Sequence, residues 1–220
     1  MFNIAIDGPS ASGKSTIAKQ LAKKLGFVHI DTGAMYRAVA LICLNQDIDL
    51  NDEKACFNIV KDLVIELPEE NMILVNGEDV SLLIRNDRVS KAASQVSKHK
   101  LVRDVLVSIQ RDIASKKGFV LDGRDITSVV LPDAEVKIFQ TADAGVRARR
   151  RFNELVKNGI ETTYEAVHAD LLERDARDMN RQESPLIKVE DAIEINTTSM
   201  SIEDVVSQII NIIESRNLND

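Results

Sequence analysis

A glycine-rich segment near the start of the chain contains the residue types that bind phosphate. It reads Gly8-Pro9-Ser10-Ala11-Ser12-Gly13-Lys14-Ser15, matches G-x-x-x-x-G-K-[ST], and lies between an apolar run and a helical pattern, as the motif requires. Glycines let successive backbone N–H groups turn toward a phosphate, and the start of a helix adds partial positive charge. We expect Lys14 to reach the β- and γ-phosphates of a nucleotide and the Ser15 hydroxyl to coordinate Mg²⁺. The alternative is a tight strand-to-helix turn that binds nothing.

Three arginines favour a kinase, whereas phosphate binding alone fits a switch or a motor equally well. Arg37 follows the turn after the second expected strand, Arg124 lies just beyond a strand that ends in Asp122, and Arg181 ends a helix. Guanidinium groups bind phosphate with two parallel hydrogen bonds, and a donor and acceptor phosphoryl pair carries more charge than one lysine can neutralise. Each arginine alone fits a surface salt bridge, so the prediction depends on their joint placement.

Two further features leave alternatives open. Asp122 follows an apolar strand, where it either anchors Mg²⁺ or its waters, or caps a turn into Gly123. A basic run opens an otherwise acidic and polar helix, and it consists of Arg147, Arg149, Arg150 and Arg151. This run forms either a solvated face or a mobile lid that closes over the nucleotide and brings a guanidinium to the transferring phosphoryl group. The sequence does not tell which of the four supplies that guanidinium.

Alternating strand and helix patterns are expected to position these residues. Apolar runs predict strands at 2–6, 27–30, 119–121, 135–139 and 192–195, and helical spacing predicts a helix after the glycine-rich turn that ends at Gly26. Further helices are expected after a turn at 31–33, at 100–117, twice within 147–181 with a break near Gly159, and at 202–213. This order predicts a parallel sheet covered on both faces, with ligands beyond the carboxyl ends of its strands. Residues 64–67 and 72–75 indicate strands of an inserted lobe.

The composition narrows the class of protein. With 44% hydrophobic and 29% charged residues, the 220-residue chain does not fit a disordered, collagenous or disulfide-stapled protein. The net charge of -7 and the 4% aromatic content disfavour a nucleic-acid partner. The absence of a signal-peptide pattern, of a long apolar stretch and of metal-ligand spacing at the two cysteines predicts a cytoplasmic protein without a membrane partner. With no heptad repeat, we expect a monomer.

Five strings, following one another along nearly the whole chain, resemble those of bacterial cytidylate kinases. They are G-P-S-A-S-G-K-S-T at 8–16, D-T-G-A-M-Y-R at 31–37, A-S-Q-V at 93–96, D-G-R-D at 122–125 and D-A-R-D-M-N-R at 175–181. The resemblance implies an α/β P-loop kinase fold in which a parallel five-stranded core sheet is flanked by helices. It implies one domain with a core at about 1–36, 100–145 and 182–220, an inserted NMP-binding lobe at about 37–99 and a helical lid at about 146–181.

The same resemblance implies an activity, namely the conversion of CMP and dCMP to their diphosphates with MgATP as the donor. ATP would be bound by the whole loop, Gly8, Pro9, Ser10, Ala11, Ser12, Gly13, Lys14, Ser15 and Thr16. CMP would be bound by Arg37, Arg124 and Arg181 at its phosphate, by Ser94, Arg103 and Asp125 at the cytosine edge, and by Asp178 near the ribose. The expected catalytic residues are Lys14, Arg124, Arg181 and Arg149, and Mg²⁺ would be held by Ser15 and, through water, by Asp122.

The implied role of Asp125 agrees with the chemistry of the base. A carboxylate accepts a hydrogen bond from the cytosine N4 amino group, whereas the uracil carbonyl would place acceptor against acceptor. Leaving buried polar groups unpaired costs about 1–3 kcal/mol. No covalent intermediate and no general base are required, because the acceptor phosphate is already ionised at neutral pH. The remaining alternatives are a P-loop kinase with another acceptor, a nucleotide-dependent regulatory module and, more weakly, a nucleic-acid-handling ATPase.

Overall fold

A computed structural model describes residues 1–69 and 72–218. The chain divides into two compact units, of which the first comprises residues 1–27 and 117–220 and the second residues 28–116. Among the helices of the described ranges, none is both long and apolar enough to cross a membrane. The predicted boundaries of core, inserted lobe and lid stay a prediction.

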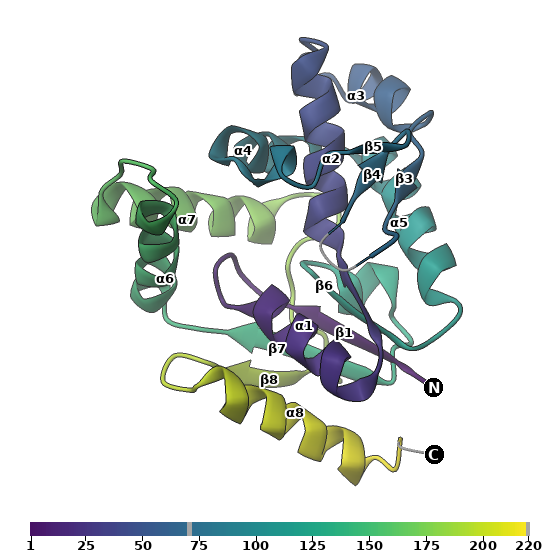
Figure 1. The fold of residues 1–220 in the computed structure, drawn as a ribbon, viewed down its shortest axis with the longest axis vertical. Coiled ribbons are helices and arrows are strands. Elements are labelled where there is room, and N and C mark those ends of the chain that lie inside the picture. Colours follow the sequence, from purple (N-terminus) through teal and green to yellow (C-terminus); the bar gives the residue numbers. More distant parts are fainter. Residues whose placement is uncertain (70–71, 219–220) are drawn as a thin grey trace. The chain divides into compact units, whose positions relative to one another are not determined.

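The first unit is built on parallel strands, shown in Figure 1. They are β1 (Asn3–Asp7), β6 (Phe119–Gly123), β7 (Val136–Thr141) and β8 (Ile193–Asn196). Parallel pairing joins β1 to β6 and β7, and β7 to β8. With β2 (Val28–Asp31) they give a five-stranded sheet of order β2-β6-β1-β7-β8, which confirms the predicted sheet. Register places the last residue of β1, Asp7, opposite Gly123 of β6 and Phe139 of β7, so these strands end at one edge.

Two helices of this unit, α1 (Lys14–Leu25) and α8 (Ile202–Ser215), pack against each other along the sheet (Figure 1). Their apolar faces share a core with Ile4, Ile6 and Ile138, to which α1 contributes Leu21 and α8 contributes Ile209. The predicted end of α1 is confirmed, because Gly26 takes a left-handed conformation with φ of 68° and donates its N–H to the carbonyl of Ala22. Ser201 and Asp204 cap the start of α8 reciprocally.

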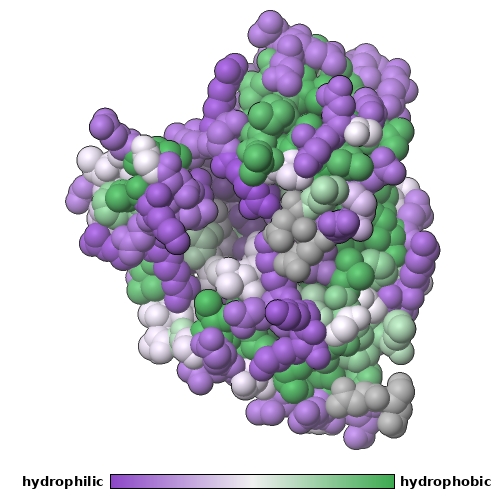
Figure 2. Space-filling model, viewed as in Figure 1, coloured by the Kyte–Doolittle hydropathy of each residue, from purple (hydrophilic) through white to green (hydrophobic). Residues whose placement is uncertain are grey.

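Two further helices of the first unit are α6 (Ala144–Lys157) and α7 (Tyr164–Asn180), which pack against each other. The predicted break near Gly159 is confirmed, since this glycine lies between them with φ of 75°. In the space-filling view, hydrophilic residues gather over both helices (Figure 2). A charged hairpin of helices therefore follows β7 directly.

The second unit is mainly helical, with a small antiparallel sheet. Its helical elements are α2 (Thr32–Asn45), α3 (Glu53–Val60), the 3₁₀ turn η1 (Leu83–Arg85), α4 (Asp87–Val96) and α5 (Lys100–Ala114). The sheet consists of β3 (Ile65–Glu66), β4 (Leu74–Val75) and β5 (Glu78–Asp79). The strands expected at 64–67 and 72–75 are present but only two residues long, and α3 and α4 were not predicted.

The turn expected at 31–33 is wrong. Asp31 is instead the N-cap of α2, and its Oδ1 accepts from the Ala34 amide at 3.0 Å, so Thr32 and Gly33 already belong to the helix. An aspartate followed by threonine and glycine is typical of a turn, but it is also typical of a helix start. The helical conformation is favoured over the turn because α2 is buried along much of its length among apolar neighbours of the second unit.

Candidate active site

The glycine-rich loop connects β1 to α1, and the side chains of Gln140 and Thr197 hold one of its peptide groups by hydrogen bonds. Gly13 has φ of 93°, and the Ser12 carbonyl before it accepts from Gln140 Nε2 at 2.5 Å and from Thr197 Oγ1 at 3.3 Å. In a trans peptide the N–H points opposite to the carbonyl. The Gly13 N–H therefore faces away from Gln140 and Thr197, toward the concave side of the loop, where the first N–H groups of α1 add partial positive charge.

The side chain of Lys14 is folded into this loop. Its Nζ donates to the carbonyl of Pro9 at 2.8 Å, and the residue is only 5% exposed. Burial and, next, the positive charge of Arg124 lower the pKa of Lys14 to about 7, against the opposing effect of Asp122 and Asp7. An anion that entered the loop would stabilise the ammonium form.

Ser15 and Asp122 lie together at the start of α1 and the end of β6. The Ser15 hydroxyl donates to Asp122 Oδ2 at 2.7 Å. A hydroxyl and a carboxylate are hard oxygen ligands, and Mg²⁺ in kinases is bound by one or two such groups together with the phosphates of the nucleotide. The residues present therefore fit Mg²⁺, as the sequence suggested for this pair.

Asp7 was not predicted to take part in the site. It is fully buried at the end of β1, and its carboxylate accepts from the amides of Ile126 and Thr127 at 2.9 and 2.7 Å and from the Thr127 hydroxyl at 2.6 Å. These bonds fix the first turn of the π-helical segment η2 (Ile126–Val130), which begins directly after Asp125. In the sequence the only signal was an aspartate at the end of an apolar strand.

Burial raises the pKa of Asp7 from 3.8 to about 6, although its hydrogen bonds oppose this. The folded state then retains a proton that the unfolded state loses first, so the free energy of unfolding should fall as the pH rises from about 4 to about 6, by an amount on the order of 3 kcal/mol. Urea unfolding of the wild type and of Asp7→Asn across pH 4–8 measures this. The variant should lack this part of the slope, and parallel curves for the two proteins would contradict the assignment.

Arg124, Asp178, Asp125 and Arg181 form two ion pairs within the first unit. Arg124 Nε contacts Asp178 Oδ2 at 2.8 Å, and Arg181 Nη2 lies 3.7 Å from Asp125 Oδ1. Burial alone would raise the pKa of Asp178, but the positive charges of Arg124 and then Arg174 hold it below its usual value. Asp178 in turn keeps the pKa of Arg124 above its usual value despite burial. The sequence predicted all four residues, and the structure brings them together in these pairs.

Arg174 was missed by the sequence analysis. It is half-buried on α7, and its charge lowers the pKa of both Lys14 and Asp178. The signal was available, because residues spaced by four and then three positions share one face of a helix, and Arg174, Asp178 and Arg181 have this spacing.

The second unit contains the other three predicted CMP contacts, of which Arg37 and Arg103 are held by neighbouring residues. Arg37 forms an ion pair with Asp31 at 2.7 Å, and the pKa of Asp31, which burial would raise, is lowered by this arginine. Arg103 is 3% exposed, donates to the Ser97 carbonyl at 3.0 Å and lies 5.4 Å from the ring centroid of Tyr36.

The third of these contacts, Ser94, has a buried hydroxyl without a hydrogen-bond partner among the described residues. A buried hydroxyl normally has such a partner, so Ser94 retains an unused capacity to bind a polar group. Its predicted contact with the base stays a prediction, as do those of Arg37 and Arg103.

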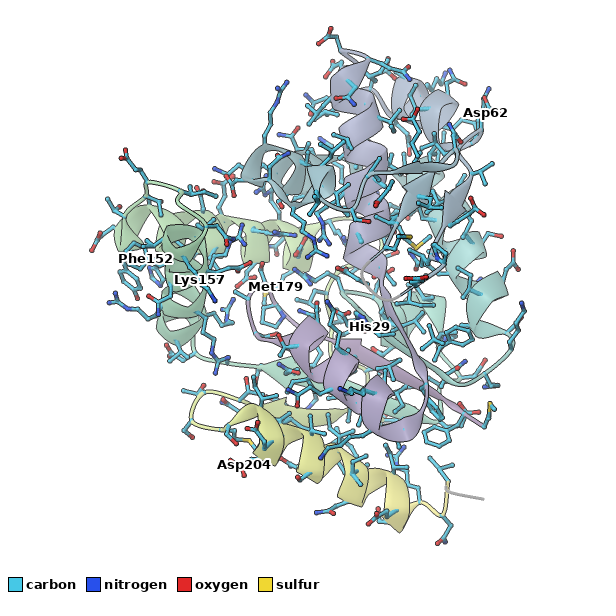
Figure 3. The ribbon with its side chains drawn as sticks, in the orientation of Figure 1. His29, Asp62, Phe152, Lys157, Met179 and Asp204 are labelled. Carbon is cyan, nitrogen blue, oxygen red and sulfur yellow. The ribbon has the colours of Figure 1, made fainter. Side chains whose placement is uncertain are left out.

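Three arginines of the basic run, Arg149, Arg150 and Arg151, differ in their contacts. Arg149 stacks on the ring of Tyr164 with 4.3 Å to the centroid, and more distantly on Phe152, which Figure 3 labels on α6. Arg151 pairs with an exposed glutamate of its own helix. Arg150 donates to the Thr197 carbonyl at 2.8 Å and to the Ser12 carbonyl at 3.3 Å. The run is therefore not simply a solvated face, and the catalytic role of Arg149 stays a prediction.

A pocket of about 470 Å³ opens beside the loop in the first unit. Residues of the loop, of α6 and of the segment around β8 and α8 line it, among them Thr16, Ile17, Arg150, Thr197, Met200 and Ile202. Apolar side chains with a few polar groups are the usual lining of a nucleotide base site. The pocket is continuous with the loop through Ser12 and Gly13, which also line it.

A parallel sheet whose first strand runs into this loop, with a buried lysine, a serine–aspartate pair and arginines gathered nearby, defines a P-loop kinase. Comparison with known proteins agrees with this class and identifies the family. The cytidylate kinase family model matches residues 4–215. A cytidylate kinase of Bacillus velezensis is 50% identical over 98% of this chain and 97% of its own length, and one of a Geobacillus species is 48% identical over the same shares. The chain belongs to the cytidylate kinase family, which confirms the resemblance.

Among solved structures, an uncharacterised protein of Eubacterium ventriosum has a similar fold. Its TM-score is 0.52 at 17% identity, and the likeness covers 97% of this chain and 98% of that one. At this identity the likeness shows the fold alone.

Proposed function

We propose that the first unit binds ATP with Mg²⁺ as the phosphoryl donor, with the base in the pocket beside the loop. Membership of the cytidylate kinase family makes the protein a nucleoside monophosphate kinase, which phosphorylates CMP and dCMP. The observation that carries the donor assignment is Lys14, an amine buried inside the loop with its Nζ 2.8 Å from the Pro9 carbonyl. A buried cation with a lowered pKa gains most from a ligand that supplies several negative charges.

In the proposed mechanism, Lys14 leaves the Pro9 carbonyl for the phosphates and stays protonated beside them. Arg124 and Arg181 neutralise charge on the transferring and acceptor phosphoryl groups, and Asp178 and Asp125 hold these guanidinium groups in place. Ser15 and Asp122 would hold Mg²⁺, which neutralises phosphate charge when bound. Arg149 would join the transition state by leaving Tyr164, which is the movement expected of a lid.

For the acceptor we propose that Arg37 binds the phosphate and that Ser94, Arg103 and Asp125 read the cytosine edge. The unused hydroxyl of Ser94 and the burial of Arg103 and Asp125 support base recognition, because polar groups in a dry site discriminate strongly. We also propose that the protein is cytoplasmic, which the free thiols of the buried Cys43 and Cys56 support.

The function is tested by ADP formation from MgATP with CMP, dCMP, UMP, AMP and GMP supplied separately, beside a control without acceptor. Turnover should be strong with the two cytidine nucleotides and weak with the rest. Hydrolysis that needs no acceptor would contradict the proposal and favour a nucleotide-dependent switch.

The same panel tests the proposed role of Asp125. Asp125→Ala should lose the preference for CMP over UMP, by about tenfold to a hundredfold in the ratio of kcat/KM values. The ratio is the readout because the variant also removes the carboxylate near Arg181, which lowers turnover with every acceptor. An unchanged ratio would refute base reading by Asp125.

A further inference from the structure

A buried ion pair that the mechanism does not use lies behind the phosphate-binding loop. Arg147 of α6 contacts Asp175 of α7, with Nη1 2.5 Å from Oδ2, and each side chain is 7% exposed. Arg147 Nε also donates to the carbonyl of Ala142 at 2.9 Å, which anchors the guanidinium to the chain just after β7. Replacing such a pair by apolar residues is often neutral for stability, so its presence calls for another reason.

Both partners of the pair bind the backbone of Ser10. Asp175 Oδ1 accepts from the Ser10 N–H at 3.2 Å, and Arg147 Nη1 donates to the Ser10 carbonyl at 3.0 Å. The Ser10 N–H is therefore already engaged by a carboxylate and is not free to bind a phosphate. The sequence had assigned this residue to ATP together with the rest of the loop.

The two contacts fix two successive peptide groups. The Ser10 N–H shares its peptide with the Pro9 carbonyl, which receives the Lys14 ammonium, so Asp175 sets the direction of that carbonyl. The Ser10 carbonyl shares its peptide with the N–H of Ala11, which Arg147 thereby directs away from itself. Ala11 has φ of 57°, a left-handed conformation that a non-glycine residue adopts only when its surroundings impose it.

We propose that Arg147 and Asp175 are positioning residues for the donor phosphates. They hold the Pro9–Ser10 peptide, whose carbonyl keeps Lys14 in the loop until ATP binds, and the Ser10–Ala11 peptide, which directs the Ala11 N–H toward the phosphates. They act through the loop and touch no reacting atom. The pair also connects α6 and α7 to the loop, because Arg147 and Asp175 both bind the Ser10 backbone. This inference rests on the proposed binding of ATP by the first unit.

The test compares Arg147→Lys and Asp175→Asn with the wild type. Lysine cannot donate to Ala142, Ser10 and Asp175 with one fixed fork, and asparagine leaves the guanidinium without a counter-charge. We expect KM for ATP to rise about tenfold to a hundredfold, while KM for CMP changes by less than about threefold. In NMR spectra, the shift of the Ala11 amide on addition of ADP should shrink in both variants. Arg147→Met should raise KM for ATP more than Arg147→Lys does, because methionine can donate no hydrogen bond to the Ser10 carbonyl.

The matched control is Lys137→Gln, which breaks an ion pair with Asp191 elsewhere in the same unit, at 2.6 Å, without touching the loop. It should lower Tm but leave both KM values unchanged. If the Arg147 and Asp175 variants lower Tm but leave KM for ATP unchanged, as the control does, the positioning role is overturned. Failure of the wild type itself to bind ATP would instead overturn the proposed function, and isothermal titration with ATP distinguishes the two results.

Discussion

Replacement of Lys14 by methionine should lower kcat for CMP phosphorylation by about a hundredfold to a thousandfold, the usual effect of removing one donor that stabilises transition-state charge. The fold should survive. Lys14 is buried and its pKa is lowered to about 7 by burial, so a neutral side chain of similar length avoids the cost of desolvating an ammonium group. The lost hydrogen bond to the Pro9 carbonyl, 2.8 Å long, offsets part of that gain.

The measurement combines steady-state kinetics with urea unfolding. The control is Lys23→Met, which removes an exposed lysine from the last turn of the same helix. It should leave kcat within about twofold, because exposed charges far from the site contribute little. A Lys14→Met enzyme with kcat within tenfold of the wild type would show that the ammonium does not act on the transferring phosphoryl group. Large destabilisation would contradict the burial argument instead.

The elements that the sequence predicted correctly are those whose pattern is set by one dominant force. β1 is buried on both faces and its three central residues, Ile4 to Ile6, are apolar, while the break between α6 and α7 contains a glycine. The short strands of the second unit and the helices α3 and α4 are different. Their boundaries depend on packing against α2 and α5, which no local window of sequence contains.

The site shows the same limit. The loop motif lies between a strand and a helix, so Lys14 and Ser15 could be placed at the start of that helix from their neighbours in the chain. Asp175 could not, because it occurs in a string with Asp178 and only the fold shows that one carboxylate binds the loop and the other binds Arg124. In the same way, Arg147 and Arg149 are two residues apart on one helix and point to the loop backbone and to an aromatic ring. Sequence spacing predicted a basic cluster, but only the tertiary contacts show which group each arginine of the cluster binds.

Gly8→Ala should be among the most destabilising single changes in the chain. A Cβ at this position would lie 2.0 Å from the Gln140 carbonyl oxygen and 3.0 Å from its carbon, both backbone atoms of β7 that cannot move without breaking the sheet. The φ of 153° adds strain. We expect the free energy of unfolding to fall by something on the order of 4 kcal/mol, the sum of overpacking and backbone strain. Urea unfolding measures it, with ATP binding followed on whatever protein remains folded.

Gly26→Ala separates the two causes, because Gly26 also has a positive φ, 68°, but a Cβ there meets nothing within 4 Å. This variant should lose only about 1–2 kcal/mol, the cost of a left-handed conformation for alanine. The excess loss in Gly8→Ala then measures how closely the loop packs on β7. That contact sets the height of the whole loop above the sheet, so any Gly8→Ala protein that folds should bind ATP poorly. Equal losses in the two variants would mean that the loop can lift from β7 freely, and the shape of the phosphate site would then depend on Arg147 and Asp175.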